Sequence, residues 1–302
     1  MEQLKKCNVE NVYDGEEIIK NYFFIPIVKE KEDYNNVRPF NYYESPYPDI
    51  REIHEKEDEI FDDSREVLGI DFNIDRQFEL LEKMKQIDAI EWGIQKQPEY
   101  RYYYGNSCFG RGSADVLHYM MRILKPNKII EVGSGFSTSV MLDTNNNCLK
   151  DSIEIKSIEP DTKRLRSLLR EHDNLEIHEC CLQDISLDFF GQLKENDILF
   201  IDSSHVSRIN SDVNYYLFEI FPRLNKGVYI HFHDMFYPFI YPKQWIYEGR
   251  AYNELYLLRA FLMNNNAFSV QFFGELLMKK YPEKLNEKLQ DISGSLWIRK
   301  DC

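Results

Sequence analysis

The stretch at residues 129–138 reads IIEVGSGFST. Its first part completes a short apolar run, residues 128–132, of the kind that forms a buried strand. Gly133 and Gly135 allow a tight turn and a close approach of the backbone to a ligand, because neither carries a Cβ atom. A helix is expected to begin directly after the turn. Strand, glycine turn and helix in this order predict the first unit of an α/β fold.

Strands and helices continue to alternate along the rest of the chain. Predicted strands lie at 128–132, 152–158, 175–180, 197–201, 227–233, 268–273 and 295–299. Predicted helices lie at 114–124, 137–142, 162–171, 213–224, 253–264 and 274–291. Such alternation is typical of parallel βαβ units. It predicts an α/β fold with a doubly wound, mostly parallel, seven-stranded Rossmann-like sheet.

The first hundred residues have a different pattern. The segments are an apolar run at 21–27, an extended loop rich in Pro, Tyr and Asn at 38–49, and helices at 52–67 and 78–90. The helices are predicted from an acidic composition in the first case and from helical apolar spacing in the second. We therefore expect an N-terminal cap of helices and loops at 1–100 and a catalytic domain at 101–302.

The composition excludes some classes of partner. With 37 Lys and Arg against 51 Asp and Glu, the net charge of -14 disfavours a nucleic-acid partner, which would need a basic surface. No apolar run is long enough to span a membrane, and residues 1–6 do not resemble a signal peptide. Six cysteines without CxxC spacing suit reduced thiols. We expect a cytoplasmic protein.

Polar residues follow the predicted strands at the edge where an open α/β sheet binds its ligands. Glu159 ends the second strand and can accept hydrogen bonds from both ribose hydroxyls of an adenosine, or can cap the next helix instead. Gln183 and Asp184 follow the third strand and suit either the adenine amino edge or a simple turn. Thr138 stands where a dinucleotide fingerprint has its third glycine, which disfavours a nicotinamide oxidoreductase.

In order along the chain, the segments IIEVGSGFST, SIEP, LQD, DILFIDSSHVSRINSDV and GVYIHFHDMFYP resemble the class I S-adenosylmethionine-dependent methyltransferases. The likeness is to the branch related to macrocin O-methyltransferase and cephalosporin-hydroxylase-like proteins, and it covers roughly residues 100–300. It implies a sheet whose last strand is antiparallel. The residues that it places at the methionine end of S-adenosylmethionine are Glu131, Gly133, Ser134 and Gly135. It places Glu159 at the ribose, and Gln183 with Asp184 at the adenine.

Three residues are candidates for the reacting end of such a site. Asp202 follows the fourth strand, so we expect it to face the sulfonium end of the cofactor. His205 has a pKa suited to a general base for a hydroxyl acceptor, although it can equally anchor the next helix. His231 and His233 point to the same side of the fifth strand. We assign the catalytic role to His233, because it is nearer the carboxyl end.

A divalent metal ion is a further candidate. Asp202 and Asp234 occupy the positions at which metal-dependent relatives place two carboxylate ligands for Mg²⁺. Those relatives add an acidic or amide ligand next, where this chain has Met235. If His205 or His233 replaces that ligand, the site favours a softer divalent ion, since imidazole prefers such metals.

Aromatic segments at 102–106 and 236–252 suit walls around a small-molecule or glycan acceptor, because sugar faces stack on such rings. They equally suit a hydrophobic plug or a homo-oligomer interface. Arg250, Asn253 and Glu254 can add polar contacts to the acceptor. We predict methyl transfer to a hydroxyl of a sugar or secondary metabolite. The alternatives are N- or C-methyl transfer and a non-catalytic module that binds S-adenosylmethionine.

Overall fold

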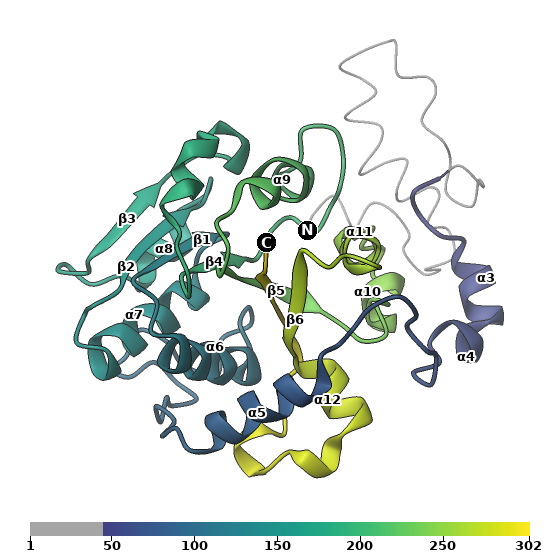
Figure 1. Cartoon of the computed structure of the whole chain (residues 1–302), viewed down its shortest axis with the longest axis horizontal. Helices are drawn as coiled ribbons and strands as arrows, with labels where there is room; N and C mark the ends of the chain where they lie inside the picture. The colour runs from purple at the N-terminus through teal and green to yellow at the C-terminus, as the bar shows by residue number, and fades with distance from the viewer. Residues whose placement is uncertain (1–44) are drawn as a thin grey trace, which may run out of the picture. The chain divides into compact units, whose positions relative to one another are not determined.

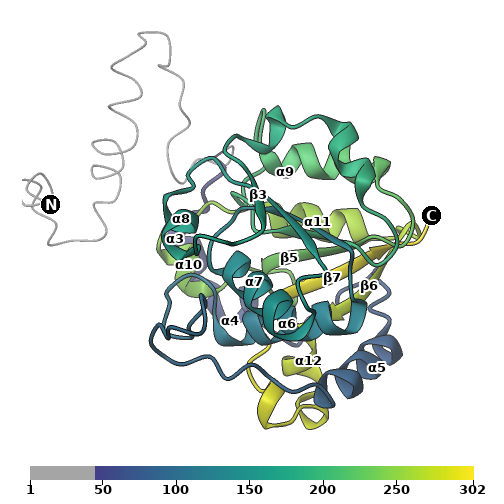
Figure 2. The ribbon, with the colours of Figure 1, turned by 90° about the vertical axis from the view of Figure 1, so that its left-hand side faces the viewer.

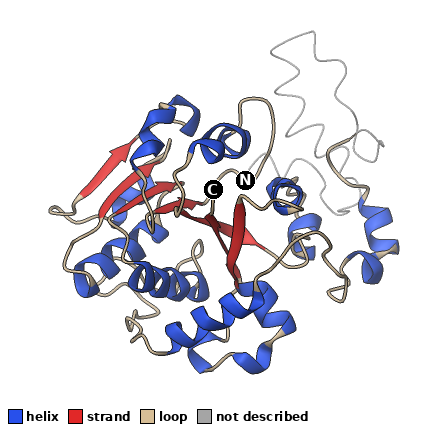
Figure 3. Cartoon of the chain, in the orientation of Figure 1, coloured by secondary structure: helices blue, strands red, loops and turns tan. Residues whose placement is uncertain are grey.

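The computed structural model describes residues 45–302, and its centre is a seven-stranded sheet (Figures 1 and 3). The strands are β1 (Lys128–Val132), β2 (Glu154–Ile158), β3 (Leu175–His178), β4 (Ile198–Ile201), β5 (Tyr229–Met235), β6 (Phe268–Phe273) and β7 (Gly294–Lys300). Their order is β3-β2-β1-β4-β5-β7-β6. The first five strands are parallel, and β7 runs antiparallel to both β5 and β6. The predicted mostly parallel sheet and its antiparallel last strand are confirmed.

The order of the central strands fixes where a ligand site can form. The chain runs outward from β1 to β3, then returns to place β4 on the other side of β1. Ligands of open α/β sheets bind at the carboxyl ends of the strands where the order reverses in this way. The glycine turn follows β1 and Asp202 follows β4, so both lie at this point.

The two faces of the sheet bury different helices. One face, with Ile129, Phe200 and Trp297, shares a core with α5 (Ile74–Lys85), α6 (Arg111–Leu124) and α7 (Phe136–Cys148). Figure 2 shows α6 and α7 side by side. On the other face, Phe232 packs on Tyr216 and Phe221 with ring centroids 6.0 and 5.8 Å apart. Because side chains alternate along a strand, His231 and His233 face the α6 side.

The remaining helices of the sheet-containing part are α8 (Lys163–Leu168), α9 (Asp212–Tyr215), α11 (Glu254–Leu262) and α12 (Gly274–Lys280). The helix predicted at 213–224 instead changes form twice. The four residues of α9 are followed by a π turn, Tyr216–Ile220, and a 3-10 turn, Phe221–Arg223, which contains a proline. The helix predicted at 274–291 ends at Lys280, since Pro282 cannot donate the next helical hydrogen bond. Two 3-10 turns, Pro282–Lys284 and Glu287–Leu289, follow it.

Contacts divide the chain into two units. The larger, Asp63–Pro242 with Tyr252–Cys302, holds the whole sheet. It also includes α5, because Leu80, Leu81 and Met84 are buried in the core. The sequence had placed this helix in an N-terminal cap that ended near residue 100.

The described part of the smaller unit contains α3 (Ile50–Glu55), α4 (Glu57–Ile60) and α10 (Lys243–Tyr247). Lys243 and Tyr247 both donate to the Glu57 carboxylate. The helix predicted at 52–67 ends at Ile60. The apolar run at 21–27 and most of the loop at 38–49 lie outside the described residues. Within residues 45–302, no helix has both the length and the apolar character that crossing a membrane needs.

Candidate functional site

The turn after β1 depends on its first glycine. Gly133 has φ of +79°, and a Cβ atom there would lie 1.9 Å from the carbonyl oxygen of Asp202. The Gly133 N–H donates to the carbonyl of Ile158 at 3.0 Å, so the turn is also tied to β2. At Gly135, by contrast, the nearest described atom to a Cβ would be the flexible end of Arg164, at 3.3 Å. The fold requires glycine at 133, whereas a side chain at 135 would first meet the side chain of Arg164.

Glu131 supports this turn from inside the protein. Its carboxylate is fully buried and accepts hydrogen bonds from Ser137 Oγ (2.7 Å), Thr138 Oγ1 (2.5 Å) and Ser157 Oγ (2.7 Å). Burial raises the pKa of Glu131 to about 7, although the hydroxyl groups that donate to it act in the opposite direction and lower it. Thr138 Oγ1 in turn accepts from the N–H of Gly135 at 3.0 Å. The threonine that departs from the dinucleotide fingerprint therefore closes the turn.

Glu159 lies beside the same turn, as predicted for a shared adenosine site. Its Oε2 accepts from the Ser134 N–H at 3.0 Å and its Oε1 from the Asp161 N–H at 2.8 Å. The Ser134 hydroxyl oxygen is buried and has no hydrogen-bond partner among residues 45–302. Two strand ends that are 25 residues apart along the chain thus form one polar surface.

The predicted adenine residues lie on the 3-10 turn Leu182–Asp184, which follows β3. The Gln183 amide donates to the carbonyl of Asn210 at 2.5 Å, and Asp184 is exposed. Since β3 lies beyond β2 when counted from β1, the turn, Glu159 and Gln183 follow each other in the order methionine, ribose and adenine that the resemblance implies.

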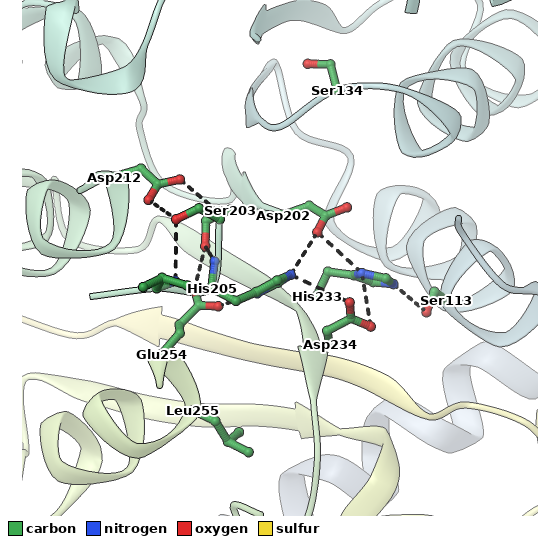
Figure 4. Close-up of polar contacts among 12 residues, drawn as sticks. Ser113, Ser134, Asp202, Ser203, His205, Asp212, His233, Asp234, Glu254 and Leu255 are labelled. Carbon is green, nitrogen blue, oxygen red and sulfur yellow. Dashed lines mark hydrogen bonds and ion pairs between the residues drawn. The ribbon is translucent and has the colours of Figure 1, made fainter. Parts of the chain in front are cut away.

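A second cluster brings together Asp202, His205, His233 and Asp234 (Figure 4). His205 Nε2 lies 3.6 Å from an oxygen of Asp202 and 3.6 Å from an oxygen of Asp234. His233 Nδ1 lies 3.5 Å from Asp202 Oδ1 and 3.4 Å from Asp234 Oδ1. Two imidazoles therefore converge on two carboxylates. The carboxylates are 31% and 26% exposed, whereas the two histidine side chains are only 8% and 7% exposed.

A distortion of β5 brings Asp234 into this cluster. The pairing of β5 with β7 shifts register between His233 and Met235, and Asp234 has φ of +57°. Such bulges re-aim side chains next to functional sites. Met235, which replaces the expected third ligand, is fully buried and cannot contribute.

Each histidine of the cluster is held from behind through its other nitrogen. His205 Nδ1 lies 2.6 Å from Glu254 Oε2, and His233 Nε2 lies 3.2 Å from Ser113 Oγ. The His233 ring also packs on Phe109, with centroids 4.9 Å apart. The sequence pattern predicted neither partnership, because Ser113 and Glu254 come from helices distant in sequence. Glu254 was expected only as a polar contact to the acceptor.

The charges of this cluster stabilise one another. Burial alone would lower the pKa of His233, but the carboxylates of Asp202 and Asp234 raise it to about 10. Burial likewise opposes protonation of His205, yet Asp202 and Glu254 raise its pKa well above the usual range. Burial would raise the pKa of Asp202, but the two imidazoles hold it well below its usual value.

His231 has a different environment from His233. Its ring stacks on Phe200 with centroids 4.2 Å apart and packs on Trp297 at 4.7 Å. Burial and the neighbouring His233 lower the pKa of His231 well below its usual range. His231 is therefore part of the core, and the catalytic role of His233 stays a prediction.

Several rings of the aromatic segments lie inside the protein. Tyr237, Phe239 and Tyr241 are buried, and the first two pack on Phe273 with centroids 6.1 and 5.6 Å apart. Tyr102 is also fully buried and donates its hydroxyl to the Phe109 carbonyl. These contacts favour the plug interpretation for these residues over the acceptor wall.

The donor atoms of the second cluster suit a divalent metal ion. Ligand atoms of Asp202, His233 and Asp234 all lie within 4.8 Å of one another. His233 Nδ1 is buried without a hydrogen-bond partner in the described chain, although it faces both carboxylates. Separations of 3.4–3.5 Å resemble those between atoms that share one ion at bond lengths of about 2.0–2.2 Å. An imidazole beside two carboxylates favours a transition metal over Mg²⁺.

Comparison with known proteins places this geometry in a family. An uncharacterized protein of Archaeoglobus fulgidus is 36% identical over 170 residues, which are 53% of this chain and 75% of that protein. A family model described as a methyltransferase domain matches residues 130–235, from β1 to the end of β5. The chain belongs to the class I S-adenosylmethionine-dependent methyltransferases. The matched residues of this methyltransferase contain both the glycine turn and the Asp202–His233–Asp234 cluster.

Comparison with solved structures found further likenesses. An S-adenosylhomocysteine-bound methyltransferase of Podospora anserina, PaMTH1, is 16% identical and covers 88% of this methyltransferase and 99% of its own chain, with a TM-score of 0.44. The apo structure of CmcI-N160 is 18% identical and covers 63% and 71% of the two chains, with a TM-score of 0.39.

Proposed function

We propose that this methyltransferase transfers the methyl group of S-adenosylmethionine to a hydroxyl of a small polar acceptor, such as a sugar or a secondary metabolite. The observation that carries the proposal is the contact between the two halves of the site. The Asp202 N–H donates to the Val132 carbonyl at 2.9 Å, and the Asp202 carbonyl fills the space that a side chain at 133 would need. The cofactor turn and the acidic cluster are therefore neighbours.

Bound S-adenosylmethionine supplies a methyl group that its sulfonium already activates. The turn at residues 133–135 and Glu159 would hold it, beside the buried Ser134 hydroxyl. The protein's main task is then to align the acceptor oxygen with the methyl carbon.

The exposed fractions indicate which groups meet the acceptor. Asp202 and Asp234 are open enough to accept a hydrogen bond from its hydroxyl. Asp234 receives the proton as the new carbon–oxygen bond forms, since the low pKa of Asp202 makes that carboxylate a poor base. His205 and His233 lie behind the two carboxylates and fix their positions. Sulfur takes the electron pair of the breaking carbon–sulfur bond.

A divalent ion fits the same groups. Asp202, His233 and Asp234 would hold it, and such an ion would make an acceptor hydroxyl more acidic. With O-methyl transfer of this kind, we expect excess chelator to lower the rate at least tenfold and a transition-metal ion to restore it better than Mg²⁺. An undiminished rate in chelator would exclude the ion.

Methyl-labelled S-adenosylmethionine and a panel of sugars, phenols, amines and activated carbon acids test the proposal. The label is expected on an oxygen atom, located by NMR of the product. Label on nitrogen or carbon would contradict O-methylation, and tight S-adenosylhomocysteine binding without transfer to any acceptor would favour the non-catalytic module.

A matched pair of variants separates binding from chemistry. Asp202→Asn is expected to lower turnover at least 100-fold with little change in S-adenosylhomocysteine affinity, whereas Glu159→Ala is expected to lower that affinity. Turnover unchanged in Asp202→Asn would remove this residue from the reaction.

The cytoplasmic location, the lack of a nucleic-acid partner and the homo-oligomer stay predictions from the sequence.

A further inference from the structure

Glu254, the first residue of α11, is a carboxylate buried in the protein. It is 1% exposed and has no lysine or arginine partner among the ion pairs of the described chain. Its oxygens accept instead from Ser203 Oγ at 3.0 Å and from the Tyr216 hydroxyl, and Oε2 lies 2.6 Å from His205 Nδ1. Burial of a carboxylate is unfavourable unless its partners satisfy it, so this set of bonds needs an explanation.

The same short segment also holds the backbone of His205. The N–H groups of Asn253 and Glu254 both donate to the His205 carbonyl, at 3.0 and 3.2 Å, and the His205 N–H donates to Ser203 Oγ at 3.2 Å. His205 has φ of +59°, a conformation that few residues other than glycine adopt. The start of α11 therefore stabilises His205 in an unfavourable backbone conformation.

These bonds occupy every polar group of His205 except Nε2. That nitrogen points the other way and lies 3.6 Å from both Asp202 and Asp234 (Figure 4). A carboxylate behind a histidine fixes the orientation of the ring and the nitrogen that it presents, as in metal sites and catalytic triads.

We propose that Glu254 is a positioning residue of this site: it orients His205 so that Nε2 alone faces the two carboxylates that receive the acceptor. The proposal rests on the proposed function for its catalytic meaning. It predicts that Glu254 acts through His205, from a place where it touches neither the cofactor nor the acceptor.

A purely structural role for Glu254 would give different results, and Tyr216→Phe is the matched control. Tyr216 is fully buried and bonds the same carboxylate, so Tyr216→Phe removes one bond of Glu254 but leaves the one to His205. We expect Glu254→Gln to lower kcat about 10- to 100-fold, the usual effect of losing such a partner, with KM for S-adenosylmethionine unchanged. Tyr216→Phe is expected to keep kcat within about threefold. Equal losses of kcat in the two variants would overturn the proposal.

A double variant tests whether Glu254 acts through His205. In His205→Gln/Glu254→Gln, kcat is expected to equal that of His205→Gln alone, because a positioning residue has no effect once its target is gone. A further loss as large as that of Glu254→Gln on its own would contradict the proposal.

A spectroscopic measurement separates this inference from the proposed function, since it needs no acceptor. In protein with ¹⁵N-labelled histidine, we expect a strongly downfield Nδ1–H proton signal that is missing in His205→Gln. It should persist in Tyr216→Phe and vanish in Glu254→Gln. Persistence in Glu254→Gln, or absence from the unmodified protein, would overturn the inference even if methyl transfer is confirmed. The expected pattern without methyl transfer would support the orientation of His205 while the proposed function fails.

Discussion

The buried carboxyl group of Glu131 makes the stability of the protein depend on pH in a way that a single substitution isolates. Its pKa is about 7 in the folded protein, where burial disfavours the charged form, against 4.5 in an exposed chain. A carboxyl group of this kind binds its proton more tightly when the protein is folded. Its contribution to stability is therefore fully present below pH 4.5 and is lost as the pH rises through 7.

The size of the effect follows from the two pKa values. At about 1.36 kcal/mol for each pH unit, the difference amounts to about 3 kcal/mol, of which about 2.5 kcal/mol is lost between pH 5 and pH 8. Glu131→Gln keeps the shape of the side chain but cannot ionise. Its amide oxygen can still accept from Thr138 and Ser157, while its nitrogen can donate to Ser137 Oγ, so we expect the variant to fold.

Urea denaturation at pH 5, 6, 7 and 8 measures the effect. The free energy of unfolding of the unmodified protein, minus that of Glu131→Gln, is expected to fall by about 2.5 kcal/mol over this range, since other titrating groups cancel in the difference. A difference that stays constant within about 0.5 kcal/mol would show that the three hydroxyl donors keep Glu131 ionised, and would refute the reasoning.

Three other predictions concern the cofactor turn. Gly133→Ala is expected to lower the free energy of unfolding, measured in urea, by more than about 2 kcal/mol, because a positive φ disfavours alanine and its Cβ would overlap the Asp202 carbonyl. An unchanged free energy of unfolding would contradict this geometry. Gly135→Val is expected to leave stability within about 1 kcal/mol but to abolish calorimetric binding of S-adenosylhomocysteine, and retained affinity would count against the site. Glu159→Ala is expected to lower the affinity for S-adenosylhomocysteine at least tenfold, because the loss of two hydrogen bonds to the ribose costs about 1.4 kcal/mol or more. An equal affinity would place the ribose elsewhere.

The strands could be predicted from the sequence more closely than the helices. The predicted bounds of β1 and β6 agree with the structure to the residue, because each is a short run rich in β-branched or aromatic residues between turn-forming neighbours. The helix predicted at 213–224 was wrong in type over most of its length. Apolar spacing does not distinguish a π turn from an α-helix, since both bury one face.

The candidate site could likewise be predicted from the sequence only in part. The polar ends of neighbouring strands could be predicted to meet, since the topology of a parallel sheet brings them to one edge. The residues that orient them could not. Ser113 lies 120 positions from His233, and Glu254 lies 49 positions from His205, so no local pattern connects either pair. The inward direction of Glu131 also depends on Ser157, which belongs to a different strand.

The contact between Gly133 and the Asp202 carbonyl limits how this enzyme can change during evolution. Any substitution that moves the backbone after β4 also displaces the loop after β1, so a lineage cannot remodel one without impairing the other. Divergent members of this lineage are expected to keep both loops fixed.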